Sequence, residues 1–265
     1  SATVKNKNAV LKFLTSKKKS KILNVEETSL PKIEILETNT RVPWSGHMAS
    51  YAIKDIYQKI KKSSLTIVFV NTRAQAELVF NKLWQENDNN LRIAIHHGSL
   101  EKEIRRKVES LMSLGKIDCV VATSSLDLGI DWGDVDLVIQ IGSPKGISRF
   151  LQRIGRSNHK FDEPSNALLV PSNRFEYLEC LSAINSIKNK LLDETKEKKG
   201  SLDVLAQHIL GVACSDPFHV DDLYNQVINA WPYRHLTKPK FFEVLEFVKN
   251  GGYSLKHYEQ YSKIG

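Results

Sequence analysis

The sequence predicts an α/β domain built on a parallel sheet with helices on both faces, followed by a mostly helical domain. Short runs rich in Val, Ile and Leu alternate with amphipathic helical patterns as far as Pro171. These runs are almost continuously apolar, as strands buried on both faces are. Beyond Pro171 the helical patterns follow one another, and no strand pattern returns until the last dozen residues.

The expected strands are too short for helices and rich in β-branched residues. They are Lys32–Glu37, Thr66–Val70, Arg92–Ile95, Cys119–Ala122, Leu137–Ile141 and Ala167–Val170. Between them, Ala74–Glu86 and Glu101–Leu114 repeat apolar residues at helical spacing, with charged residues at the other positions. Strands that alternate with helices in this way predict the parallel sheet.

The second half of the chain predicts a different architecture. A helix is expected at Asn173–Leu192, and a charged link, Asp193–Gly200, follows it. Three more helices are expected, at Leu202–Ala213, Val220–Ala230 and Lys238–Lys249. Two glycines then precede Tyr253–Ile264, which alternates weakly as a strand or hairpin does. Three helices followed by a hairpin are the order of a winged helix.

Composition narrows the class of protein. The 265 residues carry a formal net charge of +8 and a pI of about 9.2, which favours a polyanionic partner, nucleic acid before a membrane surface. Cys119, Cys180 and Cys214 lie far apart in apolar stretches, so we expect reduced core thiols and neither a disulfide nor a metal site. No signal peptide or membrane-spanning run is visible. These features predict a cytoplasmic protein with no membrane partner.

The segment Ser148–His159 carries the sharpest chemical signal. On a helix, Arg149, Arg153 and Arg156 fall at i, i+4 and i+7 and so share one stripe, while apolar residues face the sheet. Three guanidinium groups on one stripe repel one another unless an anion lies against them, and their forked donors fit phosphate oxygens. The stripe therefore predicts a phosphate clamp. A solvent-facing basic helix is the alternative.

Polar loops after the other strands predict further ligand contacts. Val121–Asp131 follows an apolar strand, at the sheet edge where parallel sheets bind ligands, and it offers the hydroxyls of Thr123 and Ser124. Asp131 suits ribose hydroxyls, although a capped turn also explains this loop. In His96–Leu100, Ser99 is expected to cap the next helix, and the adjacent histidines face opposite sides of a strand.

Together these segments resemble a superfamily 2 helicase. Asn71-Thr72-Arg73 resembles motif IV, Ala122–Asp131 motif V, and Gln152–Arg156 motif VI, in that order and each after a strand. His96–Leu100 is similar to the additional loop between motifs IV and V. Ser1-Ala2-Thr3 is similar to motif III, the end of the first RecA-like domain. We therefore expect a fragment that begins at that motif.

A closer resemblance, to the Lhr family, covers nearly the whole chain. It rests on five segments: Arg41–Ala49, Asn71–Glu77, Gly129–Gly133, Gln152–His159 and Asp203–His208. Leu169–Glu176 and Gly251–Tyr253 are similar to the ligase-associated DEXH-box DNA helicases. Asn158 departs from motif VI, where many helicases carry Gly, so no role is transferred to it.

The resemblance implies a division of the chain. Residues 1–30 would be a remnant of the first RecA-like domain, 31–172 the second RecA-like domain, 173–200 a helical linker, and 201–265 the N-terminal part of a winged-helix domain.

The resemblance also implies roles for individual residues. Arg153 and Arg156 would be catalytic arginine fingers on ATP, and Asp131, Gly129 and Gln152 would contact the nucleotide. The residues expected to contact the nucleic acid are Asn71, Thr72, Arg73, Gly98, Thr123 and Ser124. The chain contains neither a G-x-x-x-x-G-K-[ST] phosphate loop nor a D-E-x-H quartet. Mg²⁺ and the triphosphate would therefore be held mainly by an upstream RecA-like domain.

Three functions remain open from the sequence. The first is part of a bacterial ATP-dependent DNA helicase, inactive alone, with DNA, the upstream domain and a DNA repair ligase or nuclease as partners. The second is a non-enzymatic DNA-binding module, in which the arginine stripe grips DNA phosphates. The third is a helicase that acts on RNA:DNA duplexes. The order of the motifs favours the first.

Overall fold

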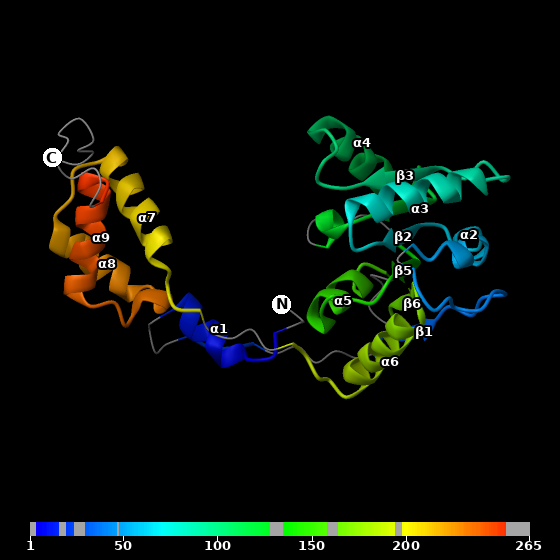
Figure 1. Ribbon diagram of the computed structural model, residues 1–265, viewed down its shortest axis with the longest axis horizontal. Helices are drawn as coiled ribbons and strands as arrows, with labels where there is room; N and C mark the ends of the chain where they lie inside the picture. The colour runs from blue at the N-terminus through cyan, green and yellow to red at the C-terminus, as the bar shows by residue number, and fades with distance from the viewer. Residues whose placement is uncertain are drawn as a thin grey trace. The chain divides into compact units, whose positions relative to one another are not determined.

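The computed structural model describes residues 4–15, 20–23, 30–46, 48–127, 135–157, 164–193 and 198–252 (Figure 1). The chain divides into two compact units, one comprising Ser1–Lys5 and Val25–Asp193, the other Asn6–Asn24 and Glu194–Gly265. The first is an α/β unit and the second is helical in its described part. Each is described by itself.

The α/β unit contains a six-stranded sheet in the order β1-β6-β5-β2-β4-β3, and every pair of neighbours is parallel. The strands are β1 (Lys32–Ile35), β2 (Thr66–Phe69), β3 (Ile93–His96), β4 (Cys119–Ala122), β5 (Leu137–Ile141) and β6 (Asn166–Val170). β4 and β5 have the predicted bounds, and the other four differ from prediction by one or two residues at one or both ends. Parallel pairing places all the carboxyl ends at one edge, which we call the carboxyl edge.

Helices cover both faces of the sheet, as predicted. One apolar layer packs α2 (Ile53–Ile60) and α3 (Arg73–Gln85) against side chains such as Val68 and Val121. The other packs α4 (Lys102–Ser113), α5 (Ile147–Ile154) and α6 (Arg174–Lys188) against Ile67 and Val120 on the opposite face. Short 3-10 helices, η1 (Ser50–Ala52) and η2 (Ser124–Leu126), complete the unit.

Three local predictions were wrong. Ser99 does not cap α4, which begins after Glu101; its hydroxyl accepts a hydrogen bond from Nη1 of Arg73 at 2.9 Å. Helix α6 is not a linker, because its buried residues Cys180 and Ile187 belong to the core beneath the sheet. Cys214 is an exposed free thiol rather than a core thiol.

The helical unit contains the three helices that the winged-helix prediction requires. They are α7 (Leu202–Ser215), α8 (Val220–Asn229) and α9 (Lys238–Asn250), packed around Leu205, Leu223 and Phe241. Helix α1 (Lys7–Leu14), which the sequence analysis placed with the first motor domain, joins this unit and packs against η3 (Trp231–Tyr233). The predicted strand or hairpin at Tyr253–Ile264 lies outside the described residues.

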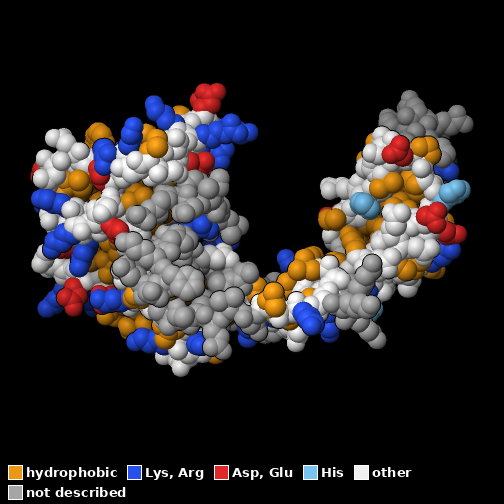
Figure 2. All heavy atoms as spheres, turned by 180° about the vertical axis from the view of Figure 1, so that it is seen from behind, with side chains coloured by type: hydrophobic (Ala, Val, Ile, Leu, Met, Phe, Trp, Pro, Cys, Tyr) orange, Lys and Arg blue, Asp and Glu red, His pale blue; other side chains and the backbone are white. Residues whose placement is uncertain are grey.

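Surface charge does not by itself locate a nucleic-acid site. Lys and Arg side chains lie at many places over the visible face of the α/β unit instead of forming one patch (Figure 2). None of the helices in the described ranges combines the length and the apolar character of a membrane span.

Candidate nucleotide and nucleic-acid site

Helix α5, which carries the predicted arginine stripe, is shorter than expected. It ends at Ile154, and Gly155 is its C-cap. Arg156 therefore lies in the turn after the helix, and it does not continue the stripe of Arg149 and Arg153. The apolar side is as predicted, since Phe150 and Ile154 are buried in the core. A single helical stripe of three arginines was thus a wrong prediction.

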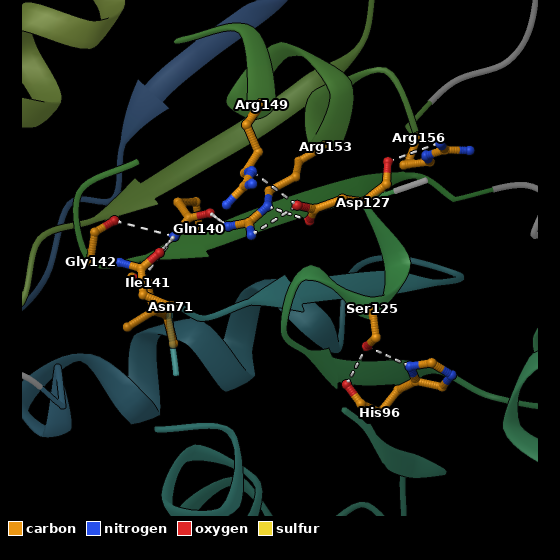
Figure 3. Close-up of polar contacts among 10 residues, drawn as sticks. All are labelled: Asn71, His96, Ser125, Asp127, Gln140, Ile141, Gly142, Arg149, Arg153 and Arg156. Atoms are coloured by element: carbon orange, nitrogen blue, oxygen red, sulfur yellow. Dashed lines mark hydrogen bonds and ion pairs between the residues drawn. The ribbon is translucent and has the colours of Figure 1, made fainter. Parts of the chain in front are cut away.

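The three arginines nevertheless converge, because each contacts Asp127 in the loop after β4 (Figure 3). Nε of Arg153 lies 2.7 Å from Oδ1 of Asp127, and Nε of Arg149 lies 3.4 Å from Oδ2. Nη2 of Arg156 donates a hydrogen bond to the backbone carbonyl of Asp127 at 3.0 Å. The anion that the sequence required against these guanidinium groups is therefore a carboxylate of the same chain.

Arg153 lies inside the unit rather than at its rim. Arg153 is 4% exposed, and its guanidinium stacks 4.8 Å from the centre of the Phe69 ring. Nη1 donates to Oε1 of Gln140 at 2.6 Å, so the buried charge is both paired and hydrogen-bonded. Removing one partner of such a pair costs about 3–5 kcal/mol because the other charge stays buried. This environment does not support the prediction that Arg153 contacts ATP as an arginine finger.

Gln140 connects the arginine cluster to the loop after β2. Gln140 is fully buried. Its Nε2 donates a hydrogen bond to the backbone carbonyl of Ile141 at 2.9 Å and lies 3.5 Å from Oδ1 of Asn71. Nδ2 of Asn71 donates in turn to the carbonyl of Ser143 at 3.0 Å. Asn71 is therefore tied into the site's interior, and the contacts run from Arg153 through Gln140 to the first predicted nucleic-acid loop.

The other predicted nucleic-acid residues lie on loops at the carboxyl edge. Thr72 is exposed and caps α3, accepting a hydrogen bond from the backbone N–H of Gln75 at 3.2 Å. Arg73 and Gly98 are also exposed, and the bond from Arg73 to Ser99 joins the loops after β2 and β3.

Thr123 and Ser124 lie between those two loops. They follow β4, the strand that separates β2 from β3 in the sheet, and Ser124 is exposed. The structure therefore brings the six predicted nucleic-acid residues into neighbouring loops at one edge. Among the predicted nucleotide-binding residues, Gln152 is half-buried on α5, whereas Gly129 and Asp131 lie outside the described residues.

The buried residue His96 contacts the loop after β4. Nδ1 of His96 lies 2.7 Å from Oγ of Ser125, and that hydroxyl is 3.0 Å from the backbone oxygen of His96. Nε2 of His96 lies 3.0 Å from Oε1 of Glu109 on α4. Burial lowers the pKa of His96 below its ordinary value, and the hydrogen bond to Glu109 offsets this only in part. His97 points the other way, to Glu77 on α3, as predicted.

The profile of the helicase conserved C-terminal domain matches residues 49–159, and that of the winged helix domain of large helicase-related protein matches residues 185–265. The chain belongs to the Lhr helicase family. The first match covers the strands β2 to β5 and the arginine turn, and the second covers the helices α7 to α9. The family prediction is therefore confirmed, while the narrower likeness to ligase-associated helicases stays a prediction.

Relatives of this Lhr chain come from archaea and bacteria. ATP-dependent helicase Lhr-Core protein 2 of Thermococcus barophilus is 36% identical over 212 residues, which cover 80% of this chain and 25% of the relative. Lhr helicase/uracil glycosylase of Escherichia coli is 38% identical over 153 residues, covering 58% of this chain and 10% of the relative. The chain thus spans about a quarter of the Lhr-Core protein. A bacterial source stays a prediction.

A solved Lhr structure supports the fold over almost the whole chain. The helicase Lhr of Mycobacterium smegmatis, bound to ssDNA and AMP-PNP, matches with a TM-score of 0.82 and 29% identity, covering 93% of this chain and 33% of that one. The DUF1998 helicase MrfA bound to DNA shares the fold at a TM-score of 0.56 and 21% identity, covering 72% of this chain and 25% of that one.

Two residues of the α/β unit were not recognised from the sequence as site residues. Gln140 is the single polar residue in the apolar run Leu137–Ile141, and a fully buried polar side chain in such a strand signals a specific partner. Asp127 was quoted only as part of motif V, and no local pattern shows that it meets residues of α5. Its role depends on contacts between segments 26 residues apart.

Proposed function

We propose that this chain is the second motor lobe and the adjoining winged helix of an ATP-dependent DNA helicase or translocase. The observation that carries the proposal is the convergence of Arg149, Arg153 and Arg156 on Asp127. Three guanidinium groups, whose donors suit phosphate oxygens, thus meet at one loop. It lies beyond the carboxyl end of β4, at the edge where open parallel sheets bind ligands.

Within the cluster, the burial of the arginines assigns them different tasks. Arg156 lies beyond the end of α5 and is half-buried, so its guanidinium is the group offered to the γ-phosphate of ATP. Arg153 is a positioning residue: it fixes the carboxylate of Asp127, whose backbone carbonyl accepts the bond from Arg156. This proposal narrows the predicted pair of arginine fingers to Arg156.

The donor chemistry of the cluster fits a triphosphate. Guanidinium groups are permanently charged, and their paired N–H donors match phosphate oxygens. When ATP and Mg²⁺ are bound, an arginine finger stabilises the charge that develops as the γ-phosphoryl group is transferred. The described residues hold no cluster of three His, Cys, Asp or Glu side chains that suits a metal ion. That Mg²⁺ is held by a first motor lobe, which would carry the phosphate loop, stays part of the proposal.

The loops at the carboxyl edge form the DNA side of the proposed lobe. Thr72, Arg73, Gly98 and Ser124 are exposed there and offer hydroxyl, guanidinium and backbone N–H donors, which suit phosphodiester oxygens. Support for DNA comes from the Mycobacterium smegmatis relative, whose structure was solved with ssDNA. Asn71 links this side to the arginine cluster through Gln140, which gives a direct path for coupling the two ligands.

The test compares this chain alone with the same chain joined to a first motor lobe that carries a phosphate loop and a D-E-x-H quartet. We expect background ATPase from the chain alone and DNA-stimulated ATPase from the pair of lobes. Unwinding of matched DNA and RNA:DNA duplexes by the two-lobe protein identifies the preferred duplex. DNA binding without any DNA-stimulated ATPase would instead support a non-enzymatic DNA-binding module. A repair ligase or nuclease as partner stays a prediction.

A further inference from the structure

Trp44 is an exposed aromatic ring at the same edge as the proposed DNA loops. It lies in the loop that follows β1 and is 68% exposed, although large aromatic side chains are normally well buried. The guanidinium of Arg174 lies 4.1 Å from the centre of its ring, a cation–π distance. Stacking by Arg174 covers one face of the indole, and the high exposure shows that solvent reaches much of the rest.

The ring is held in place by its own loop. The backbone N–H of Arg174 donates to the carbonyl of Pro43 at 3.0 Å, and its Nε donates to the carbonyl of Val42 at 3.2 Å. Nδ2 of Asn173 donates to the carbonyl of Gly46 at 3.0 Å, on the other side of Trp44. Three hydrogen bonds thus fix the chain around one exposed ring. A fixed ring loses little conformational freedom when a ligand stacks on it.

The position of this loop relates it to the proposed DNA contacts. Val42–Gly46 packs on Asn173 and Arg174, which follow β6 after two residues, so it lies at the carboxyl edge. In the sheet, only β5 separates β6 from β2, whose loop carries Thr72 and Arg73. Two strand spacings are about 10 Å, a separation that a few nucleotides span.

We propose that Trp44, backed by Arg174, is a stacking platform for a base of a single-stranded nucleic acid that continues from the loops after β2, β4 and β3. The inference rests on the proposed function and extends its binding track to the β1 side of the sheet. An aromatic face beside a cation is the recurring arrangement for single strands, because every base offers a π-face and the neighbouring phosphate is anionic. Such a platform discriminates little between bases.

The experiment uses this chain and a short oligothymidylate, and it measures affinity by fluorescence anisotropy over a range of salt concentrations. Trp44→Ala is expected to weaken binding roughly 5- to 100-fold, the worth of one stacked base, while Trp44→Phe retains most of the affinity. Stacking releases no counterions, so the salt slope stays unchanged in Trp44→Ala. In Arg73→Ala, a phosphate contact is lost, and the slope falls by about 1.

Trp84 is the matched control. It is 57% exposed, but it lies near the end of α3 and lines a surface cavity beside Arg92 and Ile93, at the amino end of β3. Trp84→Ala is expected to bind the oligothymidylate as the wild type does. A second readout places a 5-iodouracil base in the oligonucleotide, irradiates the complex, and maps the crosslinked peptide by mass spectrometry. The crosslink is expected at Trp44.

The outcomes separate this inference from the proposed function. If Arg73→Ala lowers affinity and slope while Trp44→Ala binds normally, the stacking platform is overturned and the DNA edge stands. Equal losses in Trp44→Ala and Trp84→Ala, or a crosslink that maps away from Trp44, also overturn the platform. If the wild-type chain binds no oligothymidylate, both proposals for its nucleic-acid contacts are overturned.

Discussion

The arginine cluster and the loops at the carboxyl edge belong to the same unit but are built in opposite ways. Arg153 is 4% exposed and meets a carboxylate, an amide oxygen and an aromatic ring of its own chain. Thr72, Arg73 and Gly98 are exposed; Thr72 caps its own helix, and Arg73 bonds to Ser99 in the neighbouring loop. The buried cluster requires its own counter-ion, whereas the loops are solvated until a ligand arrives.

This difference determines what a mutation can show. A substitution in the buried cluster changes the free energy of unfolding as well as any activity, since an unpaired charge would stay in the core. A substitution in the exposed loops acts mainly on binding, because the wild-type side chain is hydrated in the free protein. Arg156, half-buried between these extremes, is the position at which a large catalytic effect with little loss of stability is expected.

The largest expected effect is on catalysis at Arg156. In the two-lobe protein, Arg156→Ala should lower DNA-stimulated ATPase on the order of 10³-fold or more, the range that arginine fingers supply. The melting temperature should change little. Arg106→Ala, an exposed arginine on α4, is the matched control and should keep wild-type turnover. Normal turnover in Arg156→Ala would remove the assigned role of Arg156.

The next effect is on stability at Asp127. Asp127→Asn leaves the guanidinium of Arg153 buried without its carboxylate, so the α/β unit should lose about 3–5 kcal/mol of unfolding free energy. Urea unfolding, with hydrogen exchange of the β4 amides to report on this unit, measures the loss.

A double variant of Asp127 and Arg153 separates the effect on unfolding free energy from the effect on ATPase. Asp127→Leu combined with Arg153→Met replaces both charges by apolar groups, and it should recover most of the lost stability. ATPase should stay low, because the carbonyl of residue 127 no longer has the ion pair that positions it beside Arg156. Full recovery of ATPase in the double variant would contradict a positioning role for Arg153.

The third effect tests whether the two regions communicate. Gln140→Leu removes the amide between Arg153 and Asn71 and leaves a buried guanidinium donor without its acceptor, which costs about 1–3 kcal/mol. The ratio of DNA-stimulated to basal ATPase should fall in the two-lobe protein, while oligonucleotide affinity changes less. Gln207→Leu, at an exposed position on α7, is the control. An unchanged ratio in Gln140→Leu would show that coupling takes another route.

The sequence predicted the buried scaffold better than the contacts of the site. β4 is a continuous apolar run, β5 is interrupted only by Gln140, and both are buried almost throughout, so their bounds were predicted to the residue. Helix α2 was missed, although Ile53, Ile56 and Ile60 recur at helical spacing and are buried. The spacing of these isoleucines is sufficient to predict α2, whereas α1 is mostly exposed and its apolar pattern is weaker.

The contacts of the site depend on partners that local patterns do not reveal. The arginines were recognised as a cluster in need of an anion, and that requirement was correct in physical terms. The anion turned out to be Asp127, brought to α5 only by the folding of the sheet. Likewise, Ser99 had the sequence of a helix cap, but its hydroxyl is bound by Arg73 from the neighbouring loop.

The smallest effect concerns pH and the histidine beneath the loop after β4. His96 faces Ser125 and Glu109, and the charges of Arg105 and His97 act on it as well. Because burial lowers its pKa below 6.5 in the folded protein, the unfolded chain binds more protons between the two pKa values. His96 therefore contributes stability that is present above pH 6.5 and is lost as the pH falls through the folded pKa.

For one proton, the slope of this loss is at most about 1.4 kcal/mol per pH unit. Urea unfolding at a series of pH values from neutral downward should show it in the wild type. In His96→Gln, the contribution of this group disappears, so the curve should be flatter over the same range even though the mean stability is lower. A slope that persists undiminished in His96→Gln would assign the acid sensitivity to the carboxylates. The buried imidazole would then hold Ser125 without acting as a titrating group of the loop.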